Sequence, residues 1–209
     1  MMINNLQENV IIRILNRIFD LIILNVLCLI TSLPIITAGA SLTALYSVTI
    51  RMVAREEGYI VRDYFRAFKK NLGKGIAEFI IVAVVQAVII ADILIILHIS
   101  DPLIRTAMSV LAVIAEVFWL MITIFVFPVT AFSDANVREN FIQAVTVPIS
   151  SLPETAVVML ITSAVMALTF LSRTTIMFGA VIWVLIGVSG VAFADSGLIR
   201  RILKPHFTI

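Results

Sequence analysis

Two polar side chains, Gln86 and Glu116, interrupt long apolar stretches of the sequence. A carboxyl group in apolar surroundings takes up a proton or needs a hydrogen-bonding partner, because an isolated buried charge is costly. If 75–98 and 103–128 form a helical hairpin, these two residues fall at similar depth on neighbouring helices. The pair is then an interhelical hydrogen bond, a proton or cation site of a small transporter or channel, or a contact with another membrane subunit.

A second pair, Asp92 and His98, lies toward the predicted outer end of 75–98. A histidine beside a carboxylate can sense pH, but two candidate ligands are too few to predict a metal site. The sequence contains no phosphate-binding loop, no nucleotide-binding fingerprint and no set of serine, histidine and aspartate at one depth. We therefore expect no enzyme, no catalytic residue, no metal and no cofactor.

The composition decides the class of protein that must position these groups. The chain of 209 residues is 61% hydrophobic and only 13% charged, with a mean hydropathy of +1.13. Soluble domains are about 45–50% apolar and about 25% charged, so this chain cannot cover a water-facing surface. These values exclude a soluble enzyme and a disordered chain. The single cysteine, Cys28, excludes an internal disulfide.

The apolar runs predict six membrane-spanning helices. A spanning helix needs about 20 mostly apolar residues. Five runs meet this length clearly and a sixth is weaker: 18–36, 75–98, 103–128, 154–172 and 175–194, with 37–54 as the weaker one. We expect Pro34 and Gly39 to form the turn of a hairpin between the first two; the alternative for 37–54 is a re-entrant or interfacial segment. The predicted fold is all-α: one membrane domain over 1–209, a polytopic helical bundle of six transmembrane helices with two amphipathic cytoplasmic segments.

The distribution of positive charge predicts the orientation. With six spans and a cytoplasmic N-terminus, every lysine and arginine except Arg105 and Arg173 falls on the cytoplasmic side, as the positive-inside rule requires. We therefore expect a multi-pass protein of the cell membrane with both termini in the cytoplasm. Four acidic residues fall at predicted cytoplasmic span ends, where we expect them to cap helices: Asp20, Glu78, Glu154 and Asp195.

The two predicted inner segments are 55–74 and 133–153. The first is a basic amphipathic helix, which would bind either the anionic lipid of the inner leaflet or a protein partner. We do not expect nucleic acid as a partner, because topology explains the positive charge. The candidate residues for docking a partner or lipid are Arg62, Phe65, Arg66, Phe68, Lys69, Lys70, Asp134, Arg138, Phe141 and Pro148.

Residues 25–71 carry a specific pattern. It consists of Asn25, Leu27, Ser32-Leu33-Pro34, Thr37, Gly39, Ala44-Leu45, Glu57-Gly58-Tyr59 and Phe65-x-x-Phe68-Lys69-Lys70-Asn71. This pattern resembles the YesL-like family of bacterial integral membrane proteins, and the length and span count agree with that family. The family has no established activity. Its members are commonly encoded beside sugar-importing ABC transporter components and glycan-degrading enzymes, so the resemblance implies a role in carbohydrate uptake.

The second inner segment is also similar to the coupling loop of ABC importer permeases, which docks on the ATPase subunit. Asp134, Phe141 and Thr146-Val147-Pro148 match that loop, whereas Ala135 replaces its glycine and the upstream E-A-A is missing. We therefore expect a non-enzymatic accessory protein of a carbohydrate uptake system, in the lipid bilayer, with an ABC importer permease or ATPase subunit as partner. A homo-oligomer is possible. The alternative is a small secondary transporter or channel that uses Glu116 and Gln86.

Overall fold

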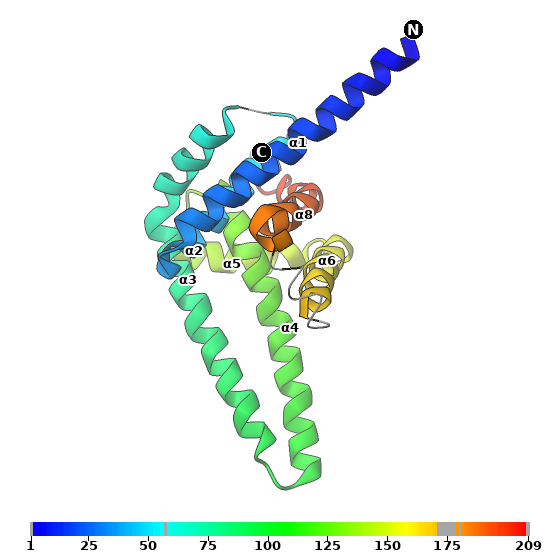
Figure 1. Ribbon diagram of the computed structural model, residues 1–209. Helices are drawn as coiled ribbons and strands as arrows, with labels where there is room; N and C mark the ends of the chain where they lie inside the picture. Colours follow the sequence, from blue (N-terminus) through cyan, green and yellow to red (C-terminus); the bar gives the residue numbers. More distant parts are fainter. Residues whose placement is uncertain (1, 57, 171–178, 180, 208–209) are drawn as a thin grey trace.

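The computed structural model describes residues 2–56, 58–170, 179 and 181–207, which form helices joined by short connections, without strands (Figure 1). Their elements are α1 (Met2–Ser32), η1 (Ile35–Thr37), α2 (Ala38–Ala54), α3 (Ile60–Leu97), α4 (Pro102–Phe132), α5 (Val137–Ile149), α6 (Leu152–Phe170), η2 (Trp183–Gly187) and α8 (Val188–Leu203). Six helical stretches are long and apolar enough to cross a membrane: Ile14–Ser32, Ile35–Ala54, Ile60–Leu97, Pro102–Phe132, Leu152–Thr169 and Trp183–Leu203. The predicted helical membrane bundle is confirmed. Glu57, Arg173 and the junction between the predicted spans 154–172 and 175–194 lie outside the described residues.

The central helix is α2, which contacts α1, α3, α4 and α8. In its membrane-crossing stretch, 61% of the residues are buried within the protein, whereas the buried share is at most 33% in each of the other five stretches. The inward residues include the hydroxyl side chains of Ser41, Thr43, Ser47 and Thr49. The weaker hydropathy of 37–54 thus has a physical reason: this helix faces protein rather than lipid, and it forms a continuous helix.

The turn between α1 and α2 contains Pro34 and is held by Thr37, whose hydroxyl donates to the carbonyl of Thr31 at 2.6 Å and to that of Pro34 at 2.7 Å. The predicted role of Gly39 is wrong, because this residue has ordinary helical backbone in the first turn of α2. Gly39 instead lies against α3, where a Cβ atom would collide with the backbone of Gly75. Its missing side chain allows two helices to approach closely.

The third helix differs from its prediction. The basic segment 55–74 is not a separate amphipathic helix, since α3 runs without a break through 38 residues, a length of about 57 Å. The hydrocarbon core of a bilayer is only about 30 Å thick, so the basic first half of α3 extends beyond it. With α4, α3 forms a long hairpin that reaches past the ends of the other helices (Figure 1). Its apolar side chains are widely exposed, as expected for a surface in contact with lipid.

The main core lies where the second half of α4 meets α2, α5, α6 and α8. Phe125, Val126 and Val129 of α4 are fully buried there, and they pack in one cluster with Ile50 of α2 and Ile199 of α8. The predicted second inner segment contributes α5, a short helix whose inner side joins the same cluster through Ala144 and Val147. The core therefore fixes α5 against the membrane-crossing helices.

Candidate functional site

Gln86 and Glu116 meet between α3 and α4, at the depth that the hairpin prediction requires. The Gln86 Nε2 atom donates to Glu116 Oε1 at 3.2 Å and to Oε2 at 3.4 Å. Both side chains are half-buried. Glu116 also lines a groove of about 220 Å³ between these helices, whose other walls are apolar except for Ser109. The geometry is that of an interhelical hydrogen bond beside lipid-facing apolar side chains.

Asp92 and His98 do not form a site with each other. Both are exposed; Asp92 lies on α3 and His98 directly follows its last residue, and six residues of separation place them about 120° apart around the helix axis. The His98 Nδ1 atom instead lies 2.8 Å from the carbonyl oxygen of Leu94 in its own helix. Within the described part of the chain, no three histidine, cysteine, aspartate or glutamate residues come together as metal ligands.

A buried polar cluster that the sequence did not predict joins α3, α4 and α5. Glu78 has no exposed surface. Its Oε1 atom accepts hydrogen bonds from Thr130 Oγ1 at 2.7 Å and from Asn140 Nδ2 at 2.8 Å, and Asn140 Nδ2 also donates to Thr130 Oγ1 at 2.9 Å. The expectation that Glu78 caps a helix is wrong, because it lies in the interior of α3. We call these three residues the Glu78 cluster.

A second unexpected set of buried polar groups joins α2, α6 and α8. The Asp195 carboxylate, fully buried, accepts a hydrogen bond from Thr162 Oγ1 at 2.8 Å. The next residue, Ser196, donates to Thr49 Oγ1 at 2.8 Å. The expected capping role of Asp195 is therefore also wrong, because Asp195 lies in the middle of α8. The sequence did not predict these contacts, because a serine or threonine within an apolar run does not indicate which neighbouring helix it will contact.

Asn25 of α1 forms hydrogen bonds with the π-helical turn η2 (Trp183–Gly187). Its Nδ2 atom donates to the carbonyl oxygens of Trp183 at 2.8 Å and Val184 at 2.7 Å, while its Oδ1 atom accepts from the backbone N–H of Ser189 at 3.0 Å. A π-helical turn shifts the normal hydrogen-bond ladder, and its polar groups need other partners in an apolar environment. Asn25 supplies these partners for η2 from a neighbouring helix.

Charged side chains from the two predicted inner segments form one surface. Lys70 Nζ lies 2.8 Å from Asp134 Oδ1, and the hydrogen bond from Lys70 lowers the pKa of the Asp134 carboxyl. We call the exposed residues of this surface the charged face: Arg62, Arg66, Lys69, Lys70, Asp134 and Arg138. The sequence placed segments 55–74 and 133–153 on the same side of the membrane, and this contact shows that they also touch each other.

The aromatic and proline candidates are less accessible than the charged ones. Phe65 is partly exposed, at 38%, but Phe68 stacks on Tyr64 with ring centroids 6.4 Å apart. Phe141 stacks on Trp119 at 6.5 Å, and Pro148 is buried. Phe141 and Pro148 therefore pack α5 against the core and do not contribute to the charged face.

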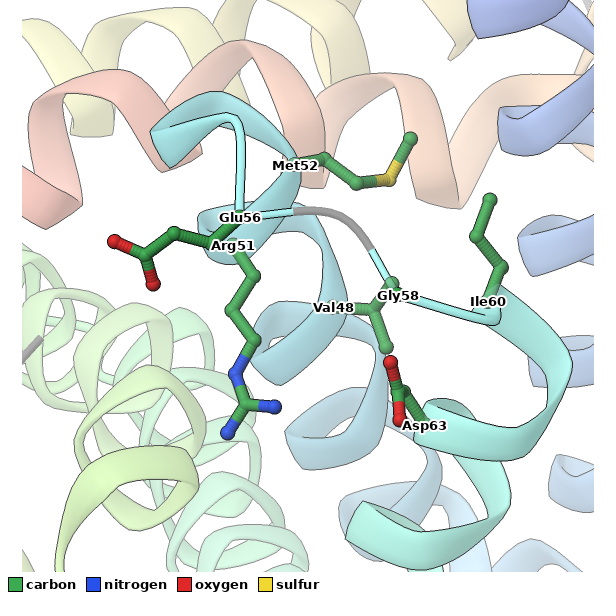
Figure 2. Close-up of a pocket in the computed structure, with 7 residues that line it drawn as sticks. All are labelled: Val48, Arg51, Met52, Glu56, Gly58, Ile60 and Asp63. Carbon is green, nitrogen blue, oxygen red and sulfur yellow. The ribbon is translucent and has the colours of Figure 1, made fainter.

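A small pocket lies between the end of α2 and the start of α3 (Figure 2). Arg51, Glu56 and Asp63 extend around it from the two helices and the segment that joins them. Its free volume is about 10 Å³, which is no more than one water molecule needs. This pocket has no room for a substrate or a cofactor.

The fold and its buried polar contacts define a multi-pass helical membrane protein. Residues 21–93 match the model of a family described as "Protein of unknown function, DUF624", the family to which YesL-like proteins belong. The matched region runs from α1 through α2 and most of α3, and so contains Asn25, Gly39, Gly75 and Glu78. No curated protein matches the chain, and no solved structure matches it.

Proposed function

We propose that this chain is a non-enzymatic accessory protein of a bacterial carbohydrate import system of the ABC type, and that it binds an importer subunit through the charged face. The observation that carries the proposal is the Lys70–Asp134 contact of 2.8 Å. This contact joins two segments that are distant in the sequence into one exposed surface. The similarity of residues 21–93 to DUF624 supports the proposal through the genomic neighbours of YesL-like proteins.

The charged face lies on the cytoplasmic side in this proposal. Lysine and arginine accumulate on that side of membrane proteins, and the permease and ATPase subunits of an importer are both accessible there. The opposite connection, between α3 and α4, is a short turn in which Asp101 accepts hydrogen bonds from the backbone N–H groups of Leu103 and Ile104. So short a turn offers little surface to a partner outside the cell.

Helix α5 is the docking element. Its outer side exposes Arg138, Ile142 and Ile149, a combination of charge and apolar surface that suits a protein contact. Its inner side carries Asn140, which is bound to Glu78. The Glu78 cluster and the core hold α5 in place, so a partner binds a preformed helix. Binding then costs less conformational entropy than it would if α5 were a loose loop that had to become ordered.

Site-specific photocrosslinking in native membranes tests this function. A photoreactive residue at Ile142 is expected to capture an importer permease or ATPase subunit, identified by mass spectrometry. The same probe at Leu103, an equally apolar position that is 80% exposed at the far end of the hairpin, is the control. Charge reversal by Arg138→Glu should abolish the crosslink, whereas Arg105→Glu should leave it unchanged. The absence of any importer subunit from the Ile142 crosslinks would refute the proposal.

The second candidate function is a small transporter or channel. The hydrogen bond between Gln86 and Glu116 within two membrane-crossing helices favours it, since ionisable groups at such depth often serve ion or proton pathways. Its test is uptake by proteoliposomes that contain the purified chain alone. Uptake coupled to a proton gradient that Glu116→Gln removes would support a transporter. The accessory function instead expects no uptake without importer subunits.

A further inference from the structure

A groove between the end of α2 and the last turns of α8 combines basic and apolar side chains in its lining. It measures about 450 Å³, and its described lining contains three basic side chains and no acidic one. The basic residues are Arg200, Arg201 and Lys204, which follow one another around the C-terminal end of α8. The apolar part of the lining includes Val53 of α2 and Leu198 of α8.

The position of the groove relative to the bilayer follows from α8. The membrane-crossing stretch Trp183–Leu203 ends beside these basic residues, so they lie at the level of the lipid headgroups. The apolar walls precede them along α8 and therefore face the acyl region. A surface that is cationic at the headgroup level and apolar toward the acyl region matches the charged headgroup and the acyl chains of one anionic phospholipid.

The charges in the groove are only partly compensated. The nearest acidic partner recorded for Arg200 is Glu56, whose Oε1 lies 3.9 Å from Arg200 Nη2, beyond ordinary hydrogen-bond distance. The buried Nε atom of Arg200 has no hydrogen-bond partner among the described residues. The C-terminal end of a helix attracts cations rather than anions, so side chains and not the helix dipole must hold a bound phosphate.

Gly197 keeps the groove open. A Cβ atom at this position would meet no other atom within 4 Å, so a side chain could be added without displacing the backbone. Gly197 lies in the lining together with Ala194, one turn earlier on the same side of α8. Two residues with small or absent side chains therefore leave the space that an acyl chain or glycerol backbone needs.

We propose that this α2–α8 groove binds the phosphate headgroup and upper acyl chains of one anionic phospholipid. Arg201 and Lys204, both exposed, contact the phosphate, and the apolar walls contact the chains. This site is independent of the proposed docking function, because it uses other residues and needs no protein partner.

Native mass spectrometry of the full chain in detergent tests the site. The probes are phosphatidylglycerol, zwitterionic phosphatidylcholine and inorganic phosphate. We expect one tightly bound phosphatidylglycerol, with phosphatidylcholine binding at least about tenfold more weakly. Equal binding of the two lipids would overturn the proposal. Displacement of phosphatidylglycerol by inorganic phosphate at equal concentration would overturn the lipid assignment, because the acyl contacts would then contribute nothing.

Three variants locate the binding. The double variant Arg201→Gln/Lys204→Gln removes two exposed charges and should weaken phosphatidylglycerol binding by about tenfold or more. Gly197→Leu keeps every charge and fills the groove, and it should weaken binding to a similar degree. The matched control Arg62→Gln/Lys69→Gln removes two charges from the charged face and should leave the tight site unchanged. An equal loss in this control, or normal binding by both groove variants, would refute the site.

Discussion

Asn140 of α5 donates a hydrogen bond to Glu78 of α3 across 2.8 Å, and neither side chain has exposed surface. A buried carboxyl group is stable only when hydrogen bonds replace its hydration, and here Thr130 supplies the second donor. The contact joins a short helix beside the charged face to the long helix of the hairpin. It makes α5 a part of the protein core.

Removing the amide should destabilise the protein. Asn140→Ala takes one of two donors from Glu78 and should lower the free energy of unfolding by about 1–2 kcal/mol. Thermal unfolding of the detergent-solubilised chain measures the change. The neighbouring exposed residue provides the control, since Glu139→Ala should change stability by less than about 0.5 kcal/mol. Equal stability of the two variants would show that the Glu78 cluster contributes nothing.

Two glycines of α3 should respond in opposite ways to the same substitution. A Cβ at Gly75 would lie 2.5 Å from the backbone N and Cα atoms of Ala40, so Gly75→Ala must separate α2 and α3, at a cost of about 1–3 kcal/mol. A Cβ at Gly73 meets nothing within 4 Å, and Gly73→Ala should stabilise the helix by about 0.5–1 kcal/mol. Midpoints of thermal unfolding distinguish them. A stable Gly75→Ala variant would contradict the close approach of these helices.

The bond between Asn25 and η2 predicts a strong effect of a nearly isosteric change. Asn25→Asp keeps the acceptor for Ser189 but places an oxygen against the carbonyls of Trp183 and Val184, which lose their donor. We expect a loss of about 2 kcal/mol or more. On the same helix, Asn16→Asp changes an exposed residue and should have little effect. The thermal unfolding curves of Asn25→Asp and Asn16→Asp should coincide only if Asn25 does not stabilise η2.

Gln86 and Glu116 should contribute modestly to stability. Gln86→Leu removes the donor and should cost about 0.5–2 kcal/mol, whereas Glu116→Gln retains a side chain that can accept the same hydrogen bond. Unfolding in detergent measures both, and uptake by importer-containing membranes measures function. Under the accessory function, Glu116→Gln leaves carbohydrate uptake unchanged. A complete loss of uptake in this variant, with normal stability, would instead assign Glu116 to a transport pathway.

The contact between Lys70 and Asp134 should depend on pH in one direction. Lys70 holds the pKa of the Asp134 carboxyl below its ordinary value, which for aspartate is about 3.9. A lowered pKa in the folded state stabilises the protein above that ordinary value, and the contribution is lost as the pH falls through the lowered pKa. Lys70→Gln should return the pKa of Asp134 toward its ordinary value, measured by carbon-13 NMR of the labelled carboxyl group. Lys69→Gln serves as the control, and equal pKa values in both variants would contradict the contact.

The sequence by itself determined the class of fold, the six apolar helices and the meeting of Gln86 with Glu116. These properties follow from local length and composition, and from the rule that a short turn makes two helices antiparallel neighbours at matching depth. The same reasoning predicted that segments 55–74 and 133–153 share one face, which the Lys70–Asp134 contact agrees with. The orientation of that face toward the cytoplasm stays a prediction.

Only the tertiary structure decided which polar residues face inward. Glu78 and Asn140 are separated by 62 positions, and Asn25 and Trp183 by 158, so no local pattern relates them. Gly39 was predicted to turn the chain, yet its use is the close approach to Gly75, which depends on where α3 crosses α2. Hydropathy measures how well a residue suits lipid, but a helix such as α2 faces protein instead. Its polar residues acquire their roles from the partners that packing brings to them.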